Sequence, residues 1–197
     1  MAYPTVSAPY GLKPVNSLDG KPYAGAIRQI PVATGFATAI FNGDTVLISD
    51  GYLIKSTTTN SGGIVGVVVG GQYVNSNGQT VQGQYIPASA ATASNAAYAY
   101  VVDDPNALFK VAVVTSGTTM GTASRNDVGS NVPLVLNAGS TTTGDSAFAV
   151  TLTGAGTTAT IPLRVIDVVP ETALSTGGYT ELFVKINTHQ YNNTTGV

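Results

Sequence analysis

The sequence predicts an all-β fold, an antiparallel β-sandwich or barrel of jelly-roll type with an extended N-terminal arm and little helix. β-branched residues dominate in short runs separated by Gly, Ser, Thr and Asn, and helical periodicity is almost absent. The turn dipeptides Asn-Gly and Asp-Gly recur between apolar runs. Hydrophobic residues make up 43% of the 197 residues, which is enough for a sizeable core.

Residues 30–56 are expected to form a meander of β-hairpins. The sequences NGD at 42–44 and SDG at 49–51 separate its apolar runs. Asn-Gly and Asp-Gly readily take the positive φ that tight hairpin turns require. Asp44 and Asp50 are therefore interpreted as hairpin residues.

Residues 64–74 form a predicted buried strand, because valines follow one another almost without interruption. The next strand, within 97–102, is followed by Asp103, Asp104 and Pro105. Adjacent carboxylates at a strand end point in different directions, and no spaced ladder of Asp and Asn typical of a calcium loop follows. A turn opened by Asp-Pro is therefore favoured over a carboxylate pair or a calcium site.

Three later segments alternate between apolar and polar residues, which assigns one face of each predicted strand to the core. The inward residues are Phe109, Val111 and Val113 in 106–114, Ile161, Leu163 and Val165 in 161–171, and Leu182, Val184 and Ile186 in 181–189. The outward residues are Lys110, Arg164, Glu181 and Lys185.

A short helix of one or two turns is predicted within 122–131, where Gly129 provides the stop signal. The segments 75–95 and 138–146 are rich in small polar residues and are expected to be long surface loops. The expected organisation is an extended arm over 1–26, a β-rich body over 27–190 and a flexible tail over 191–197.

The arm contains SAPYGLKPV at residues 7–15, which suits neither a helix nor a central strand because its prolines fix φ and cannot donate to a ladder. Tyr10, Leu12 and Val15 nevertheless favour burial. We expect the segment to dock in extended form on a neighbouring subunit, and self-packing on its own domain is the alternative. The expected contact residues are Ala8, Pro9, Tyr10, Gly11, Leu12, Lys13, Pro14 and Val15.

Charge is unusually scarce. Asp, Glu, Lys and Arg make up 9% of the chain, against roughly 25% in ordinary soluble domains. Such a surface suits a protein that lies against other proteins. The net charge is −2 and the eight basic residues are scattered, so nucleic acid is not an expected partner.

No targeting signal is expected in this sequence. The N-terminus has no basic region followed by an apolar one, so no signal peptide is expected. The longest apolar runs are too short for a membrane span, so no membrane partner is expected and the product should be soluble and not secreted.

The residues give little sign of catalytic chemistry. His189 is the only histidine, cysteine is absent, and neither Gly-x-Ser-x-Gly nor Ser-x-x-Lys occurs. His189 is interpreted as a strand-end side chain hydrogen-bonded to local backbone. The sequence GAGTTA at 154–159 matches a dinucleotide-binding pattern, but a strand pattern follows it, so it predicts a hairpin loop. We expect no enzyme activity, no cofactor and no metal; an unrecognised hydrolase site is the remote alternative.

Several segments occur in an order that resembles capsid decoration (cement) proteins of short-tailed and related tailed bacteriophages. They are APYGLKPV, FNGDTV, IVGVVVGG, VVDDPNALFKV, IPLRVIDVV and ELFVKINTHQY, which together extend from about residue 8 to residue 191. Each motif is short, and their order and spacing carry the resemblance.

The resemblance implies a structural virion protein, made in the host cytoplasm, that binds the outer capsid surface. Its implied partner is the major capsid protein, whose subunits it would bridge to reinforce the head. A homo-oligomer, dimer or trimer, is also implied. The alternative is a virion-surface adhesion or carbohydrate-binding β-domain that uses the ten tyrosines, which are dispersed along the sequence.

Overall fold

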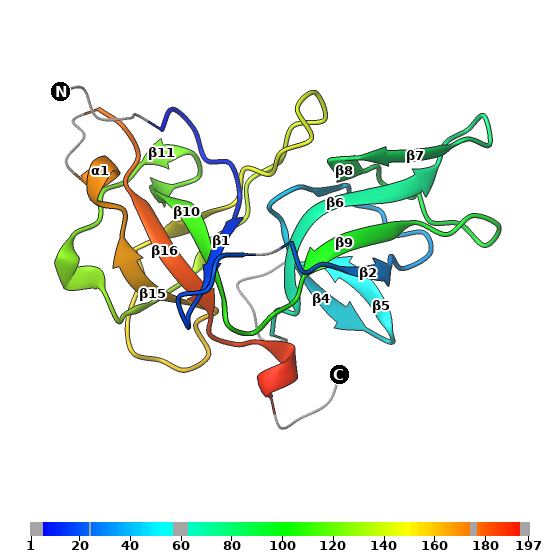
Figure 1. Ribbon diagram of the computed structural model, residues 1–197. Coiled ribbons are helices and arrows are strands. Elements are labelled where there is room, and N and C mark those ends of the chain that lie inside the picture. The colour runs from blue at the N-terminus through cyan, green and yellow to red at the C-terminus, as the bar shows by residue number, and fades with distance from the viewer. Residues whose placement is uncertain (1–5, 24, 57–62, 174–176, 194–197) are drawn as a thin grey trace.

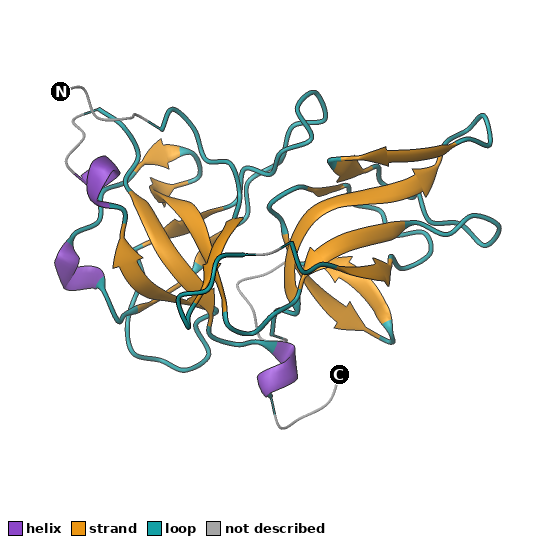
Figure 2. Cartoon of the chain, in the orientation of Figure 1, coloured by secondary structure: helices purple, strands orange, loops and turns teal. Residues whose placement is uncertain are grey.

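The computed structural model describes residues 6–23, 25–56, 63–173 and 177–193. These residues form sixteen short strands, one four-residue α-helix and two 3-10 turns, so the predicted all-β class is confirmed. The strands gather into two lobes that lie side by side (Figures 1 and 2). The buried hydrophobic residues form two clusters: one lies within a single lobe, and the other fills the neighbouring lobe and also includes Ile64, Val67 and Val102 of the former.

The first lobe is an eight-stranded sheet organised around β10, with the order β12-β15-β16-β10-β14-β13 and with β1 and β11 also paired to β10. All of its strand pairs are antiparallel except β10 with β14. The strands are β1 (Lys13–Ser17), β10 (Ala107–Ser116), β11 (Thr119–Met120), β12 (Asn131–Val132), β13 (Leu134–Val135), β14 (Ala149–Thr151), β15 (Leu163–Val168) and β16 (Glu181–Ile186).

The alternation expected for the strands of this lobe is largely confirmed. Eight of the nine residues assigned to the core are buried there: Phe109, Val111, Val113, Leu163, Val165, Leu182, Val184 and Ile186. Ile161 precedes β15 and is only half-buried. Glu181, expected on the solvated face, is also buried, and its surroundings are described below.

The second lobe is a small barrel. Its strands are β2 (Arg28–Pro31), β4 (Thr45–Ser49), β5 (Tyr52–Lys55), β6 (Gly66–Val74), β7 (Thr80–Gly83) and β9 (Tyr98–Val102). The order is β2-β9-β6-β4-β5, with β7 added to β6. A parallel bridge between Val32 and Leu53 connects the two ends of this order, which nearly closes the barrel around its own core. Strands β3 (Ile40–Phe41) and β8 (Tyr85–Ile86) form a separate pair.

The barrel lobe is inserted in sequence between β1 and β10, two strands that pair within the first lobe. Asp103, Asp104 and Pro105 carry the chain back from β9 to β10. Asp104 accepts hydrogen bonds from Asn106 N at 2.8 Å and from Ala107 N at 3.0 Å, so the predicted turn is confirmed. Because β9 and β10 belong to different sheets, the segment 27–190 contains one complete lobe and most of the other.

The two turn sequences of residues 30–56 behave differently. Asp50 and Gly51, with φ of 51° and 82°, connect the paired strands β4 and β5, so this hairpin is confirmed. Asn42 and Gly43 also form a turn, closed by Asp44 N donating to Phe41 O at 3.0 Å. The hairpin expected at Asn42 and Gly43 is wrong, since β3 pairs with the distant β8 instead of β4.

Helical structure is confined to single turns. The predicted helical segment contains a 3-10 turn, η1 (Arg125–Asp127), capped by Ser124. The four-residue helix α1 (Pro170–Ala173) and the 3-10 turn η2 (Gln190–Asn192) were not predicted. Residues 75–95, expected as a loop, contain β7 and β8.

Candidate functional site

The predicted contact segment, residues 8–15, lies against its own chain. Pro9, Gly11 and Leu12 are buried, and Leu12 belongs to the core of the first lobe. Ser7 and Ala8 are exposed, and Tyr10, Lys13, Pro14 and Val15 are half-buried. Contact with a neighbouring subunit therefore stays a prediction for the parts of this segment that solvent reaches.

Gly11 and Leu12 connect the two lobes. Gly11 N donates to the carbonyl of Phe148 in the first lobe at 3.1 Å, and Leu12 N donates to the carbonyl of Gly43 in the barrel lobe at 2.9 Å. Gly11 has a φ of +80°, and a Cβ placed there would lie 2.7 Å from both Gly43 O and Ser146 Cβ. Only glycine fits this position. These five residues are called the interlobe tie below.

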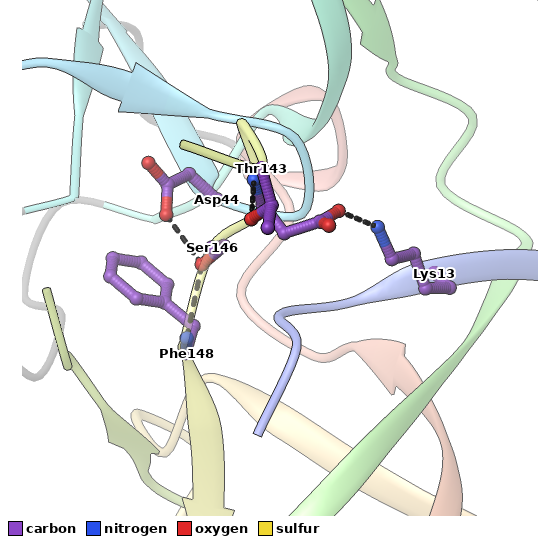
Figure 3. Close-up of polar contacts among 6 residues, drawn as sticks. Lys13, Asp44, Thr143, Ser146 and Phe148 are labelled. Carbon is purple, nitrogen blue, oxygen red and sulfur yellow. Dashed lines mark hydrogen bonds and ion pairs between the residues drawn. The ribbon is translucent and has the colours of Figure 1, made fainter. Parts of the chain in front are cut away.

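Asp44 lies beside the interlobe tie and is fully buried. Its carboxylate accepts hydrogen bonds from Phe41 N at 2.7 Å and from Ser146 Oγ at 2.6 Å. Ser146 Oγ in turn accepts from Phe148 N at 3.0 Å, and Figure 3 shows the contacts from Asp44 through Ser146 to Phe148. Lys55 Nζ forms an ion pair with Asp44 at 2.7 Å. The same ammonium lies 4.8 Å from the ring centre of Phe148 and 5.1 Å from that of Phe41.

This environment changes the interpretation of Asp44. Burial raises the pKa of its carboxyl, and Lys55 and the hydrogen-bond donors oppose that rise. Asp44 was expected to be a hairpin residue, but its side chain is the buried partner of Lys55 at the junction of the lobes. The sequence could not indicate that Asp44 lies at this junction, because Ser146, which donates to its carboxylate, comes from the other lobe.

Residues 138–146, expected as a surface loop, reach across to the barrel lobe. Asn42 N donates to Gly144 O at 3.0 Å, and Ser146 N donates to Asn42 O at 2.9 Å. Lys13 and Asp145 form an ion pair at 2.8 Å beside these contacts (Figure 3). The loop extends between the lobes in Figure 1 and adds a second set of connections to the interlobe tie.

Tyr10, the residue just before the interlobe tie, packs against the start of β16. Its hydroxyl donates to Glu181, and Lys110 Nζ lies 3.2 Å from the same carboxylate and 5.9 Å from the Tyr10 ring centre. Burial, followed by the hydrogen bond and charge of Glu181, raises the pKa of Tyr10 above its ordinary range. The expectation that Glu181 is solvated is wrong, because Tyr10 covers the outward face of β16 at this point.

Replacing Tyr10 with phenylalanine is expected to lower the free energy of unfolding by about 1.5 kcal/mol, because a hydrogen bond to a buried carboxylate is lost while Lys110 still pairs with it. Urea unfolding of Tyr10→Phe measures the change. Tyr52→Phe, at an exposed position, is the matched control. Equal stability of the two variants would contradict the contact.

His189 is buried where the C-terminal segment meets the barrel lobe. Its Nδ1 accepts a hydrogen bond from Tyr191 N at 3.2 Å, so the predicted bond to local backbone is confirmed. A parallel bridge joins His189 to Ile64. Nearby, Asp103 pairs with Arg28 at 2.9 Å and accepts from the Tyr191 hydroxyl at 3.2 Å.

Burial lowers the pKa of His189 below 6.5, although the charges of Asp103 and Asp104 oppose this shift. Below pH 6.5 the unfolded chain therefore binds more protons than the folded one, and the stability that neutral His189 contributes is lost as pH falls. The expected slope is at most about 1.4 kcal/mol per pH unit as pH falls through the unfolded-state pKa of about 6.5. Unfolding free energies of the wild type and His189→Gln at several pH values test this. Parallel pH profiles would contradict it.

The barrel lobe presents a surface with very little charge. No Asp, Glu, Lys or Arg occurs between Lys55 and Asp103, and within 28–102 the charged residues are Arg28, Asp44, Asp50 and Lys55. Asp44 and Lys55 are buried together. Only Arg28 and Asp50 therefore carry charge at the surface of this lobe.

One side of this lobe carries tyrosines and glutamines. Cross-strand register places Gln29 opposite Tyr100, Tyr98 opposite Gln72, and Gln72 opposite Gln82. The Gln72 side-chain oxygen accepts from Tyr100 OH and from Gln82 Nε2, both at 3.2 Å. These five residues are called the barrel face below. Sequence reasoning missed it, although the long uncharged stretch and the spacing of Tyr98 and Tyr100 indicated it.

The other sequence motifs have structural explanations. GAGTTA at 154–159 is followed by strand β15 instead of a helix, so no helix N-terminus is present there to bind a pyrophosphate. The expected hairpin loop is wrong as well, since the flanking strands β14 and β15 do not pair with each other. Over the described residues, no group of three or more His, Asp or Glu side chains is arranged to hold a metal ion. In the same part of the chain, no helix is long and apolar enough to cross a membrane.

No protein-family model matches the chain, and neither a curated protein nor a solved structure matches it.

Proposed function

We propose that this chain is a non-enzymatic structural virion protein that binds the outer surface of a phage capsid and stabilises the head. Its partner is the major capsid protein, whose adjacent subunits it bridges. In this proposal the chain is made in the host cytoplasm, acts on the assembled head as a dimer or trimer, and needs no cofactor.

The barrel face is the observation that carries the proposal. Protein interfaces are depleted in charged residues at their centre and enriched in tyrosine. Covering Gln29, Gln72, Gln82, Tyr98 and Tyr100 removes no ionised side chain from water, so the desolvation cost is low. An uncharged face over four paired strands is thus suited to lie against another protein.

The joint between the lobes supports a bridging role. Backbone hydrogen bonds of Gly11 and Leu12, together with the hydrogen bond that Ser146 Oγ donates to Asp44, hold the two lobes as one unit. A unit of this kind can contact two capsid subunits at once. Many weak contacts repeated over a lattice then give strong attachment.

Sedimentation of the purified chain with phage heads that lack it tests the proposal. Gln29→Glu combined with Gln82→Glu adds charge at two exposed positions of the barrel face, and we expect binding to fall at least about tenfold. Ser94→Glu combined with Ala96→Glu adds the same charge to an exposed loop of the same lobe and serves as the control. Equal binding by both double variants would contradict the proposed role of the face.

The exposed part of residues 8–15 is proposed as a second contact with the capsid. Deleting the whole arm would also remove Leu12 from the core, so a loss of binding after deletion would not be informative. Ala8→Glu changes an exposed side chain while Leu12 stays in place. Weaker binding of this variant at unchanged stability is expected.

An adhesion or carbohydrate-binding role is the second candidate. Tyr98 and Tyr100 lie on the same face of β9, beside the amide of Gln72, and rings and amides of this kind can stack on and hydrogen-bond sugars. Titration with host polysaccharide distinguishes this role. Saturable binding that is lost in Tyr98→Ala, without binding to heads, would favour it over the capsid proposal.

A further inference from the structure

Strand β7 (Thr80–Gly83) forms the outer margin of the barrel lobe (Figure 1). It pairs with β6, and no other strand of the described residues pairs with it. We propose that two copies of this chain associate by antiparallel pairing of their β7 edges about a twofold axis at Val81. This inference does not depend on capsid binding.

The hairpin register shows which backbone groups point outward from this edge. Asn75 N donates to Gln79 O at 2.9 Å at the end of the hairpin, and Tyr73 faces Val81 two residues further along. In an antiparallel ladder, every second residue directs its N–H and C=O toward the partner strand. Val81 therefore directs these groups toward β6, and Thr80 and Gln82 direct theirs away from it.

This edge is complementary to itself. A twofold axis at Val81 places Thr80 opposite Gln82 of the second copy, and Gln82 opposite its Thr80. Both outward-facing residues then exchange N–H···O=C bonds with their partners, which gives four backbone hydrogen bonds. The two Val81 residues meet at a non-hydrogen-bonded position, where side chains approach closely.

Apart from its short length, the edge lacks the features with which proteins usually block such pairing. Exposed edge strands normally carry a lysine, a proline or a bulge. β7 reads TVQG and keeps an uninterrupted register with β6 over all four residues. Since no charge occurs between Lys55 and Asp103, the paired edges themselves bring no like charges together. A second copy matches this neutral edge by symmetry, which favours it over an unrelated strand.

A four-residue edge buries little area, so the dimer is expected to be weak when free in solution. Covalent trapping is therefore the suitable measurement, and the chain has no cysteine to interfere. In Val81→Cys, the two thiols of a dimer sit at a non-hydrogen-bonded pair with Cα atoms about 4.5 Å apart, within the range that a disulfide spans. Mild oxidation is expected to give a disulfide-linked dimer.

Ser94→Cys, in an exposed loop of the same lobe, is the control for random collision. We expect its yield of dimer to be several-fold lower than that of Val81→Cys. Equal yields from the two variants would overturn the proposal, whether or not the chain binds capsids.

Charge placement tests the register itself, with each double change added to Val81→Cys. Thr80→Lys with Gln82→Lys brings lysines opposite each other across the axis, and we expect trapping to fall to the level of the loop control. Thr80→Lys with Gln82→Glu brings opposite charges together, and we expect trapping to persist. Identical yields from the two would overturn the axis at Val81. Loss of head binding in the lysine pair, without trapping of Val81→Cys, would assign the edge to a capsid strand instead.

Discussion

Asp44→Asn is expected to lower the free energy of unfolding by about 3 to 5 kcal/mol, the largest effect of any single substitution proposed for this chain. The change keeps the shape of the side chain but leaves the Lys55 ammonium buried beside Phe41 and Phe148 without its counter-charge. An amide also cannot accept all the hydrogen bonds that the carboxylate accepts from Phe41 N and Ser146 Oγ.

Chemical denaturation of the wild type and Asp44→Asn measures this loss, and Asp50→Asn is the matched control. Asp50 belongs to the exposed hairpin turn, so its change is expected to cost no more than about 0.5 kcal/mol. Adding Lys55→Met to Asp44→Asn removes the unpaired charge and is expected to recover much of the stability. A double variant as unstable as the sum of the single changes would contradict a direct ion pair.

Gly11→Ala is expected to cost about 2 to 4 kcal/mol, from the positive φ and the overpacking together. The new methyl group would meet Gly43 O and Ser146 Cβ at 2.7 Å, and backbone cannot move aside as a flexible side chain can. The displaced segment would also strain the hydrogen bonds of Gly11 N and Leu12 N, so the connection between the lobes should loosen.

Gly20→Ala separates the two causes. Gly20 has a φ of +83°, close to the value at Gly11, but a Cβ there meets nothing within 4 Å. Its substitution is expected to cost about 1 kcal/mol, the backbone contribution alone. Thermal or urea unfolding of both variants gives the comparison. Equal losses would show that Gly11 is needed for its backbone angle and not for close contact between the lobes.

Much of the fold could be predicted because alternation and turn chemistry are local. The valines of β6, the alternating faces of β10 and β16, and the Asp50-Gly51 hairpin all follow from neighbouring residues in the sequence. The predictions that were wrong concerned contacts between residues far apart in the sequence. β3 was assigned to its neighbour β4, but it pairs with β8, more than forty residues away.

The division into two lobes could not be predicted either, because it also depends on which distant strands pair. A turn such as Asp103-Asp104-Pro105 looks the same whether the next strand joins the same sheet or another one. Glu181 shows a related limit: alternation assigned it to the outer face correctly, but it could not indicate that Tyr10 covers that face.

The candidate site was predicted only in outline. Sequence reasoning found that SAPYGLKPV contains side chains that need cover, and the structure covers Leu12 within its own chain. The positive φ of Gly11 and its approach to Gly43 depend on residues that are far apart in sequence. The barrel face was not predicted, because Gln29, Gln72, Gln82 and the two tyrosines come together only when the strands pair.

The central claim is that this chain lies on the outer surface of a phage head, and a density map of the intact particle tests it most directly. We predict density for the two lobes across a junction between major capsid subunits. The barrel face, from Gln29 to Tyr100, should be turned toward the shell, with Ala8 near a neighbouring subunit. Particles whose heads lack this chain, or a barrel face directed entirely into solvent, would contradict the account.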